Sequence, residues 1–122
     1  MGLTKEIPLP STIDLKSGSD HVLERHVGNN PDWEHKSKWS GNKSDWKTIA
    51  RDTFRNPERV VQSGDRFIYE KTYKKPIGVD SDGITPLYKS RVVVEANGKM
   101  VTAFPESEFK ELADHEKIIG CH

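Results

Sequence analysis

The stretch from Tyr88 to Ser107 reads YKSRVVVEANGKMVTAFPES, and it decides the fold. Two runs rich in β-branched residues flank Asn97-Gly98, a dipeptide typical of the two-residue type I′ turn of a β-hairpin. Such a turn predicts five opposed pairs: Ala96 with Lys99, Val94 with Val101, Val93 with Thr102, Val92 with Ala103, and Arg91 with Phe104.

This register divides the hairpin into two faces, because alternate residues of a strand point to opposite sides. We expect one face to join the core; it carries Val92, Val94, Val101 and Ala103. The other face carries Arg91, Val93, Thr102 and Phe104. On that face Arg91 and Thr102 are diagonal neighbours, about 7–8 Å apart and within reach of a long side chain. Since charges rarely face a core unpaired, Arg91 is a candidate functional residue.

Composition bounds the class of protein. A chain of 122 residues suffices for one domain with a modest core. Its 19 Lys and Arg balance 19 Asp and Glu, so any contact with nucleic acid must come from a local group of cations. Cys121 is the single cysteine, which excludes an internal disulfide. No apolar run approaches transmembrane length, and residues 1–12 lack the apolar centre of a signal peptide, so we expect no membrane contact from the folded domain.

The rest of the chain predicts helices before strands. We expect residues 1–19 to form an extended arm and residues 20–122 to form a single domain. The expected elements are a helix at 20–27 capped by Ser19 or Asp20, a structured loop at 29–43, a helix at 44–56, strands at 59–62 and 66–74, a loop at 76–86, the hairpin, and a last helix at 106–119. This order predicts an α+β domain, with N-terminal helices packed on a central antiparallel sheet of about four strands.

Several polar residues are candidates for a site. They are His21, Arg25, His26, His35, Lys36, Lys71, Arg91 and Thr102. RNA cleavage without a metal needs a base for the 2′-hydroxyl, an acid for the leaving oxygen, and cationic or hydroxyl donors around the phosphate. These residue types supply such parts. In the predicted helix, the dipole favours a neutral His21 as base in the first turn and a charged His26 as acid near the last turn.

Simpler interpretations of these residues remain open. His26 falls on the apolar stripe of its helix and could be a packed core histidine. His21 and His26 lie about 140° apart around an ideal helix, so both cannot point straight into one site. His35 and Lys36 could be solvated loop residues, and Thr102 is a favoured strand residue. The histidines and the cysteine show no C-x-x-C or H-x-x-x-H spacing, so the sequence predicts neither a metal site nor a cofactor.

Four stretches in this order resemble one group of bacterial toxins. They are DHVLERH at 20–26, NPERVV at 56–61, RFIYEK at 66–71 and RVVVEANGKMVTAFPE at 91–106. The chain resembles the C-terminal toxin domains of contact-dependent growth inhibition and related polymorphic systems. Within these, it is similar to the barnase–EndoU–colicin–RelE superfamily of small ribonucleases.

This resemblance implies both a fold and an activity. The fold would be α+β around a central antiparallel sheet. The activity would be metal-independent cleavage of RNA, most often transfer RNA, by a secreted toxin acting in the cytoplasm of a target bacterium and blocked by a cognate immunity protein. By the family pattern, His21 or His26 would supply acid–base chemistry, and Thr102 would lie at the scissile phosphate.

Charge stabilisation at the phosphate would fall to Arg91. We expect Lys71, Lys36 and Arg25 to bind the substrate. The alternative is a non-catalytic RNA- or protein-binding module on the same fold, with Arg91 as a phosphate clamp or an interface anchor. The oligomeric state is left open by the sequence.

Overall fold

A computed structural model describes residues 10–27, 36–40 and 45–121 of the chain. The elements are α1 (Lys16–His26), β1 (Lys38–Trp39), α2 (Asp45–Arg55), β2 (Arg59–Ser63), β3 (Arg66–Thr72), β4 (Gly78–Val79), β5 (Pro86–Leu87), β6 (Lys89–Glu95), β7 (Met100–Glu106) and β8 (Glu116–Cys121). Residues 1–9 of the predicted arm, His35 and most of the predicted loop at 29–43 lie outside this part.

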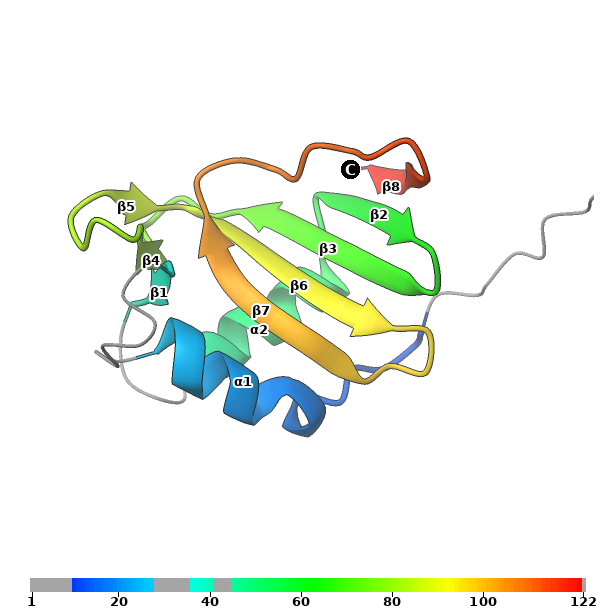
Figure 1. Ribbon diagram of the computed structural model, residues 1–122, viewed down its shortest axis with the longest axis horizontal. Coiled ribbons are helices and arrows are strands. Elements are labelled where there is room, and N and C mark those ends of the chain that lie inside the picture. Colours follow the sequence, from blue (N-terminus) through cyan, green and yellow to red (C-terminus); the bar gives the residue numbers. More distant parts are fainter. Residues whose placement is uncertain (1–9, 28–35, 41–44, 122) are drawn as a thin grey trace, which may run out of the picture.

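Within the described residues, the main sheet has five antiparallel strands in the order β7-β6-β3-β2-β8 (Figure 1). Strands β1, β4 and β5 form a second, three-stranded sheet. Strand β4 and the first residue of β5 lie inside the predicted loop at 76–86. The expected α+β class is therefore confirmed, with one strand more in the main sheet than predicted.

The two helices cover different parts of the main sheet. Helix α2 packs against β3 and β6, and α1 lies along the edge strand β7 (Figure 1). The predicted apolar stripe of α2 is buried at Trp46, Ala50, Thr53 and Phe54. These side chains meet the inward-facing residues of the central strands, which include Phe67, Tyr69, Val92 and Val94. No helix among the described residues has the length and apolar character to cross a membrane.

Helix α1 begins at Lys16 rather than after a cap at Ser19 or Asp20. The Asp14 carboxylate accepts a hydrogen bond of 3.0 Å from the Lys16 N–H, which satisfies one free donor at the start of the helix. The Asp14 backbone N–H also donates to the Gly98 carbonyl in the β6–β7 turn. The predicted arm boundary at residue 19 is therefore wrong, because the chain is already attached to the hairpin before that point.

The β6–β7 turn differs from the predicted type I′ turn. Among the described residues here, only Gly98 has a positive φ, 91°, whereas a type I′ turn requires positive φ at both central residues. The Glu95 N–H donates to the Lys99 carbonyl, so residues 96–98 form a three-residue loop. Such a loop ends in a glycine bulge, and the predicted pair of Ala96 with Lys99 is wrong.

The three-residue loop shifts the register next to the turn by one residue, so Val94 lies opposite Met100 and not opposite Val101. A second irregularity lies between Val93 and Val94, where Val101 is an extra residue on β7, and it restores the predicted register. Three pairs beyond it are as predicted: Arg91 with Phe104, Val92 with Ala103, and Val93 with Thr102. Met100 therefore joins the core, while the predicted core residue Val101 is only partly buried.

The predicted last helix at 106–119 is also wrong. Residues 107–115 cross back over the sheet without helix, and β8 then pairs antiparallel with β2 at the edge opposite α1 (Figure 1). The end of this segment pairs with the open edge of β2 and does not form a helix. Ile118 and Ile119 favour a strand because they are β-branched. Cys121 belongs to β8.

Substitution of Gly98 tests the attachment of the N-terminal segment to the hairpin. We expect Gly98→Ala to lower the free energy of unfolding by about 2 kcal/mol or more, because alanine disfavours this φ and its Cβ would lie 2.5 Å from the Thr12 carbonyl oxygen. Gly64→Ala is the matched control, since Gly64 also has a positive φ, 62°, but no atom within 4 Å of the added Cβ. Urea unfolding at pH 7 measures both. If both variants lose the same free energy of unfolding, the contact with Thr12 contributes nothing.

Candidate functional site

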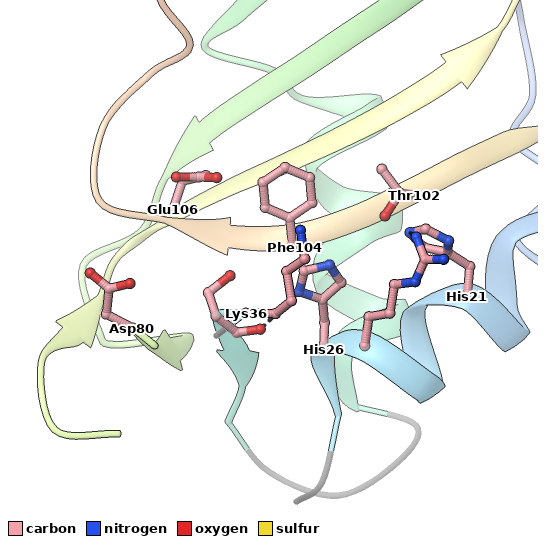
Figure 2. A pocket seen from close by; sticks show the side chains of 9 residues that line it. His21, His26, Lys36, Asp80, Thr102, Phe104 and Glu106 are labelled. Carbon is pink, nitrogen blue, oxygen red and sulfur yellow. Dashed lines mark hydrogen bonds between the residues drawn. The ribbon is translucent and has the colours of Figure 1, made fainter. Parts of the chain in front are cut away.

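A cavity of about 360 Å³ opens where α1 meets the outer edge of β7 (Figure 2). Its lining residues are His21, Arg25 and His26 of α1, Lys36 and Ser37 before β1, Asp80 after β4, and Thr102, Phe104 and Glu106 of β7. The two main walls come together because α1 packs along β7. A cavity of this volume is within the range of sites for small ligands.

Five of the predicted site residues line this cavity: His21, Arg25, His26, Lys36 and Thr102. Both helical histidines line this cavity, although the 140° between them on an ideal helix does not let both point straight into it. Their ring centroids are 6.3 Å apart. One regular helix therefore supplies both rings.

His26 is a buried, hydrogen-bonded histidine at the end of α1. Its side chain is 5% exposed, and Nδ1 lies 2.8 Å from the Ser37 carbonyl oxygen. Because a carbonyl only accepts, Nδ1 carries the proton and donates it, and Nε2 remains an acceptor. Burial lowers the pKa of His26 to about 4, against a smaller opposing effect of the bond to Ser37. His26 is therefore neutral at pH 7.

The helix dipole does not decide the charges of the two histidines. His21 is not in the first turn, since α1 begins at Lys16. Burial lowers the pKa of His21, and the neighbouring Arg25 lowers it further. The expected positive charge on His26 is also not favoured, because desolvation outweighs its position near the C-terminal end of the helix. Both rings are therefore biased to the neutral form.

Thr102 brings a hydroxyl to the cavity from β7 (Figure 2). Its Oγ1 is buried and makes no hydrogen bond within the described residues. A buried polar atom without a partner costs about 1–3 kcal/mol, so such atoms are usually satisfied by something. A ligand oxygen in the cavity would satisfy this one, since a hydroxyl can both donate and accept.

Two carboxylates in the cavity, Asp80 and Glu106, were missed by the sequence analysis. Burial raises the pKa of Glu106, and this effect is partly opposed by Arg91. Strand alternation from Thr102 through Phe104 leads to Glu106, so the period-two pattern contained a signal for it. Asp80 follows a two-residue strand, and nothing local in the sequence indicates that it faces this cavity.

Arg91 lies beside the cavity and does not line it. Its Nε donates to the Glu70 carboxylate at 3.1 Å, and its Nη1 to the Glu106 carboxylate at 3.4 Å. Its Nη2 donates to the Glu108 carbonyl at 3.2 Å. All three guanidinium nitrogens are therefore engaged by acceptors of the protein itself.

Lys71 also lies away from the cavity. Its ammonium donates to the Asp52 carboxylate at 2.7 Å and so connects β3 to α2. Alternation along β3 places Lys71 on the same face as Phe67 and Tyr69, and this face packs against α2. The structure thus separates Lys71 from the histidines with which it was grouped.

Comparison of the chain with protein-family models, curated proteins and solved structures finds no match. Within the described residues, no three or more His, Cys, Asp or Glu side chains are grouped so that they could hold a metal ion. What the cavity can do follows from its own chemistry: a neutral histidine, a hydroxyl without a partner, two cationic side chains and a protonatable carboxyl.

The buried His26 makes stability depend on pH. Its pKa is about 4 in the folded chain and 6.5 when exposed, so the unfolded chain binds an extra proton between these values. The stability that the neutral ring contributes is present above pH 6.5 and is lost as the pH falls towards 4. We expect a loss of roughly 3 kcal/mol over this range.

Urea unfolding of the wild type and of His26→Gln at pH 7, 6, 5 and 4 measures this contribution. A glutamine amide can still donate to the Ser37 carbonyl but does not titrate. The difference between the two free energies of unfolding should therefore carry the pH dependence of His26 alone. Parallel curves would show that His26 is not buried as a neutral ring.

Proposed function

We propose that this domain is an endoribonuclease that cleaves RNA by metal-independent transesterification. The observation that carries the proposal is the pairing of a neutral, buried histidine with an unsatisfied threonine hydroxyl in one cavity. An attacking 2′-hydroxyl needs a base that is unprotonated at neutral pH, and a scissile phosphate needs donors around its oxygens. Both requirements are met by side chains that the fold holds in place.

His26 is the proposed base. The Ser37 carbonyl holds the proton on Nδ1, so Nε2 accepts the proton of the 2′-hydroxyl as that oxygen attacks the phosphorus. The stacked Phe104 ring, with a centroid 5.1 Å from that of His26, fixes the plane of the imidazole. A base with a pKa of about 4 is weak but is available at every physiological pH.

The phosphate is proposed to sit between Thr102 and the cationic side chains of the cavity. The Thr102 hydroxyl would donate to a non-bridging oxygen, which supplies the partner that this buried atom lacks. Arg25 and Lys36 contribute positive charge on the opposite wall. Their effect is strongest in the transition state, when negative charge on the phosphoryl oxygens increases.

Glu106 is the proposed acid. The leaving 5′-oxygen must take up a proton when the phosphorus–oxygen bond breaks, and burial raises the pKa of the Glu106 carboxyl, which favours its protonated form. The products are then a 2′,3′-cyclic phosphate and a free 5′-hydroxyl. His26 and Glu106 exchange protons with water to begin the next cycle.

We propose further that the domain acts as a secreted toxin on transfer RNA in a target bacterium. The motifs shared with contact-dependent growth inhibition toxins support this reading, as does a cavity that combines acid–base groups with cations. The same cations would attract an acidic immunity protein that covers the cavity. A chain with zero net charge must find RNA through such local cations.

The purified domain is expected to cut total bacterial transfer RNA in the presence of EDTA, giving fragments with 2′,3′-cyclic phosphate on a denaturing gel. His26→Ala should lower the cleavage rate by about 10²–10⁴-fold, because it removes the base, while RNA affinity is retained. Lys36→Ala should weaken RNA binding and reduce its salt dependence by about one counterion. Lys117→Ala is the control, since Lys117 is an exposed cation on β8 at the opposite edge of the sheet.

Two outcomes would overturn the proposal. RNA that stays intact both with EDTA and with added Mg²⁺ would show that the domain is no nuclease. If such a domain still bound RNA and lost affinity with Lys36→Ala, it would be a binding module. Unchanged cleavage by His26→Ala would assign the base to another residue.

A further inference from the structure

We propose that Arg91 is a positioning residue, which holds the Phe104 ring over His26 and so keeps water away from the imidazole, and is not a ligand of the scissile phosphate. This inference deepens the proposed ribonuclease function and rests on it for its importance to catalysis. The physical claim itself concerns three stacked side chains and can be tested without any substrate.

The Phe104 ring lies between Arg91 and His26. Its centroid is 5.1 Å from that of the His26 ring, with the two planes 18° apart. The Arg91 guanidinium carbon is 5.4 Å from the same centroid. Because β7 lies between β6 and α1, Arg91 contacts the ring from the side of β6 and His26 from the side of the helix. Phe104 thus separates the fixed charge from the imidazole.

Arg91 is suited to this task because its guanidinium cannot easily turn. Its three nitrogens donate to Glu70, to Glu106 and to the Glu108 carbonyl. Glu70 is itself fixed, since its carboxylate also accepts hydrogen bonds from the side chain of Arg59 and from the Lys110 N–H. A guanidinium held in this way keeps its positive charge over the aromatic ring, a contact that arginine favours.

The same contacts argue against a direct role at the phosphate. The guanidinium would have to leave Glu70, whose side chain is 2% exposed, in order to reach into the cavity. Withdrawing a partner from an acceptor buried to this degree leaves its charge uncompensated and is strongly unfavourable. Arg91 also lies behind Phe104 as seen from His26. Its positive charge therefore serves Glu70, Glu106 and the Phe104 ring.

By supporting the Phe104 ring, Arg91 limits the access of water to His26. The remaining charged or titratable groups that face it come from its own helix, from the segment at β1 and from across the cavity; they are His21, Arg25, Lys36, Lys38, Asp80 and Glu106. Glu106 is the one member of this group that accepts a hydrogen bond from Arg91 among the described contacts, so the other groups keep their partners when Arg91 is changed. A Phe104 ring without its support would move and admit water, and the largest cause of the low pKa of His26, its burial, would weaken.

Histidine NMR titration of the intact domain tests this. The wild-type His26 resonance, assigned by its absence in His26→Gln, should titrate near pH 4. Arg91→Ala should raise the pKa of His26 by about 1 unit or more towards its ordinary value. Arg59→Ala is the matched control, because it also removes an arginine from Glu70 but makes no contact with Phe104 among those described. It should leave the pKa of His26 within about 0.3 unit of the wild type.

Arg91→Lys separates position from charge and serves if Arg91→Ala fails to fold. A single ammonium keeps the charge but lacks the planar fork of a guanidinium. It cannot reach the same three acceptors while it also supports the Phe104 ring, so the pKa of His26 should still rise. A wild-type pKa in Arg91→Lys would mean that charge alone is responsible, and this would overturn the proposal. Equal shifts in Arg91→Ala and Arg59→Ala would also overturn it, since both would then report general loosening through Glu70.

These titrations fail independently of the ribonuclease proposal. If the wild type does not cut RNA while the pKa of His26 responds as expected, the positioning role stands and the proposed function falls. If RNA is cut and the pKa of His26 is unchanged in Arg91→Ala, the proposed function stands and the positioning role falls. Where both succeed, the acidic limb of the pH–rate profile should move upward with Arg91→Ala, because that limb reports the protonation of the base.

Discussion

The buried carboxylate of Glu70 is the constraint on which the rest of the sheet depends. It lies on the central strand β3, 1% exposed, and a charge at such a place is tolerated only when it is paired and hydrogen-bonded. Arg59 comes to it from β2, Arg91 from β6, and the Lys110 N–H from the segment that leads to β8. One ionised group therefore ties together three neighbouring strands and the returning chain.

The candidate site depends indirectly on the hydrogen bonds that Glu70 accepts. The helix that carries the histidines lies against β7, and its approach is close: a Cβ added at Gly18 would lie 2.7 Å from the Met100 carbonyl oxygen. Strand β7 in turn is held in register by β6, which carries Arg91. The distances across the cavity are thus determined by backbone packing and sheet pairing rather than by the cavity side chains themselves.

The sequence was most informative where structure is local. The pairing of Arg91 with Phe104, the helix at 44–56 and the strands at 59–62 and 66–74 all follow from neighbouring residues, and the structure confirms them. The predicted helix at 106–119 was wrong because part of this segment pairs with the edge of β2, which is distant in the sequence. For the same reason the sequence did not indicate that Asp80 lines the cavity, and it grouped Lys71 with the histidines. Sheet faces and loop positions are set by tertiary packing. Thr102 was found because alternation placed it correctly, but the lack of a partner for its hydroxyl is a three-dimensional property.

The place of β8 has a consequence for the order of folding. Hairpins such as β2–β3 and β6–β7 join residues close in the chain and can form early, whereas β8 must close a long loop to reach β2. The two walls of the cavity, α1 and β7, are likewise far apart in sequence. Before these distant parts meet, the chain carries all of the side chains of the cavity, but His26 is still exposed to water. The burial that lowers the pKa of His26 is therefore a property of the assembled domain and of none of its parts.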